Sequence, residues 1–155
     1  MTAKDKIKEK RELKQLAIDQ LAQRIDNAES AMKNAQNSAN EEDKSSAGDK
    51  YETARAMGQL EADMNAKQLD EARKDLSHIE KINVNLQLET VAEGAVVHTD
   101  KQKFFISIGL ATVQYKKNPV VFISLSSPLG KAFDARRIND EINFNSKTYR
   151  ITDIY

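Results

Sequence analysis

Apolar residues recur at helical spacing along the first half of the chain. One series is separated by alternating steps of three and four residues, which is typical of an a/d seam on one face of a helix. This first series comprises Ile18, Leu21, Ile25, Ala28, Met32, Ala35 and Ala39. A second helical series, with one shift of register after Met64, comprises Tyr51, Ala54, Met57, Leu60, Met64, Leu69, Ala72, Leu76 and Ile79. The two series predict two long helices.

A short polar segment separates the two series. Residues 40–49 read Asn-Glu-Glu-Asp-Lys-Ser-Ser-Ala-Gly-Asp, in which serine, glycine and aspartate interrupt the apolar spacing. Two helical segments of similar length joined by a short polar turn are typical of an αα-hairpin. We therefore predict an antiparallel α-helical hairpin, or coiled coil, over residues 1–84, with an acidic tip near residues 40–50. The seam residues become smaller toward this turn, which favours a tapering rod.

The second half of the chain has a different pattern. It contains both prolines and most of the phenylalanine and β-branched residues, which favour strands. The predicted strands are Ala95–His98, Phe104–Ile108, Val120–Ser124, Glu141–Phe144 and Tyr149–Ile154. The second and third of these are apolar on both faces, so we expect them in the middle of a sheet.

Local signals complete this second half. Ser127 is the expected N-cap of a short helix whose first residue is Pro128, and Asn145-Ser146-Lys147 is a plausible hairpin turn. The predicted fold class is therefore α+β. The hairpin of residues 1–84 is followed by a small antiparallel sheet with one helix in residues 85–155.

Composition and charge narrow the function classes. The chain has no cysteine, which excludes disulfides and thiolate metal sites and favours a cytoplasmic setting. The polar N-terminus does not resemble a signal peptide, and no apolar run is long enough for a membrane span. Residues 1–90 hold 15 Lys/Arg and 18 Asp/Glu, whereas residues 91–155 hold 9 and 6. Neither part is basic enough to indicate general nucleic-acid binding.

Candidate catalytic residues are few. There is no phosphate-binding glycine loop, nucleophile motif or zinc-ligand spacing, and we expect both His78 and His98 to be surface residues. The exception is the predicted tip, where carboxylates could offer one or two oxygens to Mg²⁺. These candidates are Glu41, Glu42, Asp43 and Asp49. The alternative is a solvated turn in which Asp49 caps the second helix, and the isolated protein is not expected to bind the ion.

Three short segments resemble the bacterial Gre transcript-cleavage factors. Residues 127–133, Ser-Pro-Leu-Gly-Lys-Ala-Phe, resemble the Ser-Pro-hydrophobic-x-x-Ala-hydrophobic helix of that family. Residues 149–155 resemble its final strand, and residues 51–55, Tyr-Glu-Thr-Ala-Arg, resemble the start of its second helix. The resemblance implies an FKBP-like C-terminal domain. It also implies a hairpin that enters the secondary channel of RNA polymerase.

The resemblance also implies an activity. Acidic tip residues of Gre factors help to hold the second Mg²⁺ and a water at the active centre, where the polymerase hydrolyses backtracked RNA. This chain would then be an accessory factor rather than an enzyme, and most simply a cytoplasmic monomer without membrane contact. It would meet the RNA 3′ end indirectly, and DNA only through the polymerase complex. The expected polymerase-binding residues are Tyr51, Arg55, Ser126, Ser127 and Pro128.

The chain departs from the family at two places, and alternatives remain open. Counting back from Tyr51 without a gap places Lys44 and Ala47 at the family's two tip acids, and Ala135 replaces the glycine that follows the helix. A secondary-channel regulator that does not promote cleavage is therefore the second hypothesis. The third is a coiled-coil adaptor unrelated to transcription, or a peptidyl-prolyl isomerase, although the chain has no tryptophan to floor a proline pocket.

Overall fold

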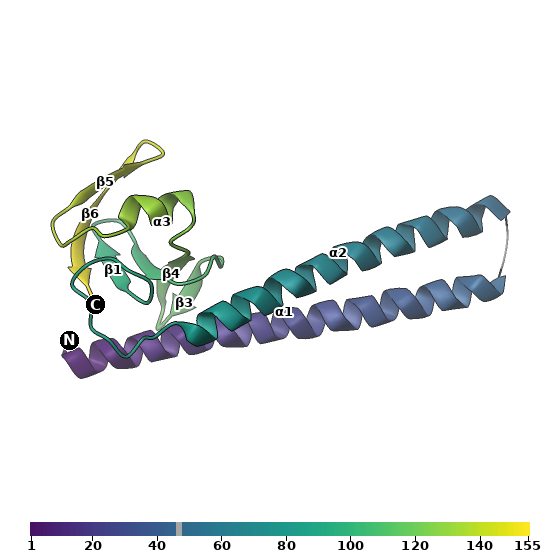
Figure 1. Cartoon of the computed structure of the whole chain (residues 1–155), viewed down its shortest axis with the longest axis horizontal. Helices are drawn as coiled ribbons and strands as arrows, with labels where there is room; N and C mark the ends of the chain where they lie inside the picture. Colours follow the sequence, from purple (N-terminus) through teal and green to yellow (C-terminus); the bar gives the residue numbers. More distant parts are fainter. Residues whose placement is uncertain (46–47) are drawn as a thin grey trace. The chain divides into compact units, whose positions relative to one another are not determined.

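The structure is a computed structural model that describes residues 1–45 and 48–155, with side-chain environments for residues 1–37 and 52–155. Two long helices precede six strands and a short third helix (Figure 1). The helices are α1 (Ala3–Ser45), α2 (Gly48–Lys81) and α3 (Pro128–Phe133). The strands are β1 (Val96–Thr99), β2 (Lys103–Ile106), β3 (Val113–Tyr115), β4 (Asn118–Ile123), β5 (Glu141–Phe144) and β6 (Lys147–Ile154). The predicted α+β class is confirmed.

The chain divides into two compact units. The first, which we call the sheet unit, combines Met1–Ile18 with His78–Tyr155. The second, the helical unit, is Asp19–Ser77. The first turns of α1 and the end of α2 therefore belong to the sheet unit. A boundary near residue 84 stays a prediction.

The sheet is mixed, so the prediction of an antiparallel sheet is wrong in one strand pair. The strand order is β3-β4-β2-β1-β6-β5, and β2 pairs with β4 in parallel, with Lys103 opposite Val120. The reason lies in the connection. The chain leaves β2, forms β3 at the outer edge of the sheet, and returns through a hairpin as β4. Strand β3 runs opposite to β2, and β4 is antiparallel to β3, so β4 runs in the same direction as β2 when it takes the place between them.

The core of the sheet unit includes β2 and β4, the two strands that the sequence predicts to be central. Phe104, Phe105 and Ile106 of β2 are fully buried, and Phe122 of β4 is nearly so. The ring of Phe104 lies 4.9 Å from the ring of Phe133 in α3, centroid to centroid. It also meets the ring of Tyr149 edge-on at 5.7 Å. These aromatic contacts hold α3 and β6 to the same core.

Burial along α2 corrects the predicted second seam. Leu69, Ala72 and Ile79 are buried as expected. However, Met57, Leu60 and Met64 are 67%, 63% and 57% exposed. The partly buried positions in this stretch are small or polar, and they continue the spacing to Leu69 without a shift: Ala54, Gly58, Ala62 and Asn65. We call Met57, Leu60 and Met64 the apolar stripe.

Ala135 gives a first test of this structure. It follows α3 with a φ of 61°, and its amide donates to the carbonyl of Val91 at 3.0 Å. A left-handed backbone costs a residue with a Cβ about 1 kcal/mol, whereas glycine adopts it freely. We expect Ala135→Gly to raise the free energy of unfolding by up to about 1 kcal/mol. Ala132→Gly, within α3, is the control and should lower it by about 1 kcal/mol. Urea denaturation measures both, and two changes of the same sign would contradict the assignment.

Candidate functional site

The predicted tip acids lie at the facing ends of the two long helices in sequence. The backbone of Glu41, Glu42 and Asp43 belongs to α1, and that of Asp49 and Tyr51 to α2. Their side chains lie outside the described residues, so their role with Mg²⁺, and the helix-capping alternative, stay predictions. Within the part of the chain whose side chains are described, no three His, Cys, Asp or Glu residues come together as a metal site.

The segment before α3 is a capped loop with an exposed edge. The hydroxyl of Ser127 donates to the carbonyl of Ser124 at 2.7 Å and accepts from the amide of Gly130 at 3.0 Å. Ser127 is therefore the N-cap of α3, as predicted, and its hydroxyl is already used in the fold. Ser126 and Pro128 are exposed. Of the candidates Ser126, Ser127 and Pro128, these two are therefore accessible to a binding partner.

Arg55, the remaining described candidate for polymerase binding, is exposed on α2. It lines a cavity of about 730 Å³ in the helical unit, together with Gly58 and Ala35. A second cavity of about 790 Å³ is lined by the apolar stripe and also by Gly58 and Ala35. These small residues border open space, so the close helix approach expected from the tapering sequence is not seen here. A Cβ built on Gly58 would meet no atom within 4 Å.

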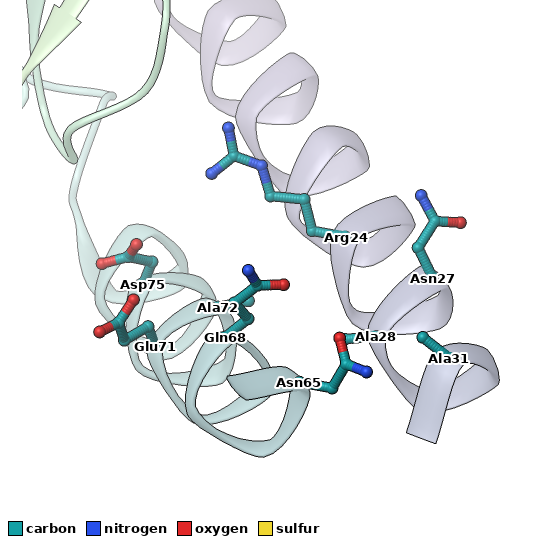
Figure 2. A pocket seen from close by; sticks show the side chains of 9 residues that line it. All are labelled: Arg24, Asn27, Ala28, Ala31, Asn65, Gln68, Glu71, Ala72 and Asp75. Atoms are coloured by element: carbon teal, nitrogen blue, oxygen red, sulfur yellow. The ribbon is translucent and has the colours of Figure 1, made fainter. Parts of the chain in front are cut away.

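A third cavity in the helical unit, of about 590 Å³, has polar walls (Figure 2). Figure 2 shows Asn65 of α2 directed toward α1, and the carboxylates of Glu71 and Asp75 next to each other on α2. Arg24 and Asn27 lie on the α1 side of the same cavity. The walls mix amides with charges of both signs. Such walls are typical of a solvated groove between helices and do not form a catalytic arrangement.

A buried polar cluster in the sheet unit was not predicted. Glu9 of α1 is only 3% exposed, and its carboxylate accepts hydrogen bonds from the Lys103 ammonium and from the Tyr155 hydroxyl, the latter at 2.5 Å. The hydroxyl of Tyr115 donates to Glu12 one helical turn later. A buried carboxylate needs such donors, because an unpaired charge is costly away from water. We call Glu9, Lys103 and Tyr155 the Glu9 cluster.

His98 extends the Glu9 cluster by one further hydrogen bond. Its Nε2 lies 2.8 Å from the Tyr155 hydroxyl. The single hydroxyl proton of Tyr155 goes to Glu9, so His98 Nε2 must carry a proton and act as the donor. The prediction that His98 is a surface residue is therefore wrong, because it is half-buried and hydrogen-bonded. His78, by contrast, is exposed and lies 2.9 Å from the Glu93 carboxylate.

Burial shifts the pKa of several groups in this region. It lowers the pKa of His98 below its usual value, so the ring is predominantly neutral at pH 7. Burial raises the pKa of Tyr155, and it raises that of Tyr115 to about 12 with help from the bond to Glu12. Lys10 is fully buried, donates to the carbonyl of Leu86 at 2.6 Å, and has its pKa lowered to about 8. None of these groups is poised as an exposed acid or base.

The sequence contains a signal for the Glu9 cluster, but the signal does not identify the partner residues. The buried apolar positions of α1 continue toward the N-terminus through Leu21, Ala17 and Leu13. Another step of three residues reaches Lys10, next to Glu9. Two charged residues at core positions of a helix indicate buried partners, but the sequence does not say which strands supply them.

No protein-family model matches this chain, and the comparison with curated proteins gave no match. Among the described residues, no helix is both long and apolar enough to cross a membrane.

Proposed function

We propose that this protein is a Gre-like transcription factor that acts within RNA polymerase. In this proposal α1 and α2 form an antiparallel hairpin that enters the secondary channel, and the C-terminal sheet is an FKBP-like docking domain. The observation that carries the proposal is a pair of helices, of 43 and 34 residues, whose adjoining ends contain four acidic residues. At 1.5 Å per residue the shorter helix spans about 50 Å, long enough to reach deep into another protein.

Contacts within each unit support the antiparallel hairpin. In the helical unit, Arg73 of α2 donates to Glu29 of α1 at 2.8 Å. In the sheet unit, the ammonium of Lys14 donates to the carbonyl of Glu80 at 3.0 Å. Later residues of α1 thus pair with earlier residues of α2, which is the order expected for antiparallel helices.

The chemistry of the tip supports action on a partner's reaction. Carboxylates on a turn can offer a hard cation one or two oxygens, while water and other groups complete the shell. The active centre of the polymerase would supply those other groups and would hold the RNA phosphate. Glu41, Glu42, Asp43 and Asp49 would then help to hold Mg²⁺ and orient the attacking water, and the polymerase would carry out the hydrolysis.

The apolar stripe supports a protein partner for the helical unit. Three large apolar side chains, all more than half exposed, follow one another along one part of α2. Contiguous apolar surface of this kind is typical of a face that another molecule covers. Arg55 is exposed two residues before the stripe begins, which places a resemblance-derived binding residue beside it.

The proposal is tested on stalled elongation complexes that contain backtracked RNA. The wild-type protein should bind core polymerase and shorten the RNA. A variant with alanine at Glu41, Glu42 and Asp43 should bind equally well and lose cleavage by about 100-fold, equivalent to about 2.7 kcal/mol of barrier. The matched control carries alanine at three other acids, Asp26, Glu61 and Glu71, and should keep cleavage. Absence of polymerase binding by the wild-type protein would overturn the proposal.

The spacing of the tip favours a second candidate function. Because Lys44 and Ala47 align with the family's acids, the chain could occupy the channel and regulate initiation or pausing without cleavage. In that case the wild-type protein binds and no shortened RNA accumulates. Leu60→Gln in the apolar stripe should weaken polymerase binding in both cases, whereas Gln59→Glu beside it should not. The same binding assay therefore separates both functions from an adaptor that ignores the polymerase.

A further inference from the structure

A cavity of about 370 Å³ opens in the sheet unit beside the turn between β1 and β2. We call it the turn cavity. Its walls come from three segments: residues 98–103 without Asp100, Thr112, and Asn118, Pro119 and Val121 at the start of β4. The parallel pairing of β2 with β4 brings Lys103 opposite Val120 and so assembles these walls. Its volume lies within the roughly 300–1,000 Å³ of small-molecule sites.

The walls of the turn cavity are rich in donors and carry no carboxylate. Lys101, Gln102 and Asn118 offer side-chain nitrogen donors, and Thr112 offers a hydroxyl. His98, Thr99 and Lys103 already donate to the Tyr155 hydroxyl, the Gln102 carbonyl and the Glu9 carboxylate. Asp100, the one acid of the turn, does not line the cavity; its carboxylate accepts from the backbone amide of Arg150 at 2.9 Å. The walls therefore suit an anion with several acceptor oxygens.

The charges around the turn cavity are not all neutralised. Lys103 is paired with Glu9, so it contributes little net charge. The ammonium of Lys101 donates to the carbonyl of Thr148, which is a neutral acceptor and leaves its positive charge uncompensated by that contact. Lys116 and Lys117 directly precede the β4 wall. Lys116 lies 4.0 Å from the Glu12 carboxylate, so its charge is partly compensated.

We propose that the turn cavity binds the phosphate group of a small molecule, either inorganic phosphate or a mononucleotide. Phosphate offers acceptor oxygens and negative charge to Lys101, Asn118 and the Thr112 hydroxyl. Pro119 and Val121 give the same cavity an apolar wall, against which a nucleoside can lie. The site belongs to the sheet unit and is independent of the proposed tip chemistry, so it can be tested without polymerase.

The test is a titration of the full-length, ¹⁵N-labelled protein followed by NMR, with inorganic phosphate, adenosine monophosphate or adenosine as the probe. We expect saturable shifts of amides in residues 98–103 and of Asn118 with both phosphate-containing probes. Stronger binding of the nucleotide would identify it as the favoured source of the phosphate, and equal binding would favour inorganic phosphate. Either result supports the site, provided that adenosine alone causes no such shifts.

Variants decide whether the shifts come from the turn cavity. Lys101→Gln should weaken phosphate binding about tenfold, because a hydrogen bond to a charged group is lost, whereas Lys131→Gln on α3 should leave it unchanged. If Lys101→Gln disturbs the fold, Thr112→Val at an exposed position removes a hydroxyl donor from the same wall. Shifts that do not saturate, that appear equally with adenosine, or that persist in both cavity variants would overturn the proposal.

Discussion

Replacing Gly130 with alanine is expected to lower the free energy of unfolding of the sheet unit by about 3 kcal/mol. Gly130 is buried in α3, and a Cβ at this position would lie 1.9 Å from the carbonyl oxygen of Ser124. The next nearest atoms are the carbonyl carbon of Ser124 at 2.8 Å and the Cα of Leu125 at 2.9 Å. All three belong to the backbone, so no side chain can rotate away. Relief requires α3 to shift against the loop that its own N-cap, Ser127, holds in place.

The expected loss of stability is opposite in sign to the usual effect of this exchange, so the two are easily distinguished. In an ordinary helix, exchange of glycine for alanine stabilises by about 1 kcal/mol. Lys131→Ala, at the neighbouring exposed position, is the control and should change stability by less than about 0.5 kcal/mol. Denaturation followed by near-UV circular dichroism reports on the sheet unit, which holds three of the four tyrosines. A Gly130→Ala variant as stable as the control would show that α3 is not held this tightly.

Local chemistry was the part of the fold that the sequence predicted best. Ser127 and Pro128 specify the start of α3, because a hydroxyl that caps the helix and a proline with preset φ both act within one turn. The turn at Asn145 and Ser146 was predicted as well, and both residues have positive φ, of 49° and 64°. Such signals depend only on neighbouring residues, so they can be predicted from a single sequence.

The short strand β3 shows where local chemistry misleads. Its hairpin to β4 turns through Lys116 and Lys117, which both adopt left-handed backbones. Sequence rules expect glycine, asparagine or aspartate at such positions, so two lysines conceal the turn and with it the strand. The parallel pairing of β2 and β4 follows from this hidden hairpin. The error in sheet type and the missed strand therefore have one cause.

The long helices show a different limit. Periodicity predicted their existence, because a 3.6-residue repeat over many turns is a strong signal. It could not choose between two overlapping faces of α2, and preference for large apolar residues selected Met57, Leu60 and Met64. The structure instead partly buries Gly58 and Ala62, together with Ala54, which the predicted seam had included. Burial depends on what covers a face, and a single sequence does not contain that information. The role of the tip acids cannot be predicted from this sequence alone for the same reason, since their proposed partner is another protein.

Removal of the Glu9 carboxylate is expected to have the largest effect in the sheet unit. Glu9→Ala should lower the free energy of unfolding by about 3–5 kcal/mol, because it leaves the Lys103 ammonium and the Tyr155 hydroxyl without their acceptor. Tyr155 is fully buried, and the side chain of Lys103 is only 20% exposed, so water cannot fully replace the lost bonds. The measurement is urea denaturation at pH 7, followed through the tyrosine signal.

A double-mutant cycle separates this pairing from simple loss of packing. If the ion pair carries the effect, Lys103→Met in the Glu9→Ala background should recover part of the lost stability, because the unpaired cation is then removed. Glu12→Ala, one turn further along α1, loses the bond from Tyr115 and an exposed 4.0 Å contact with Lys116, and it should cost no more than about 1–2 kcal/mol. Strictly additive effects of the Glu9 and Lys103 changes would mean that the two side chains do not depend on each other. The stability of the first turns of α1 would then rest on their buried apolar residues, of which Leu13 and Ala17 are fully buried.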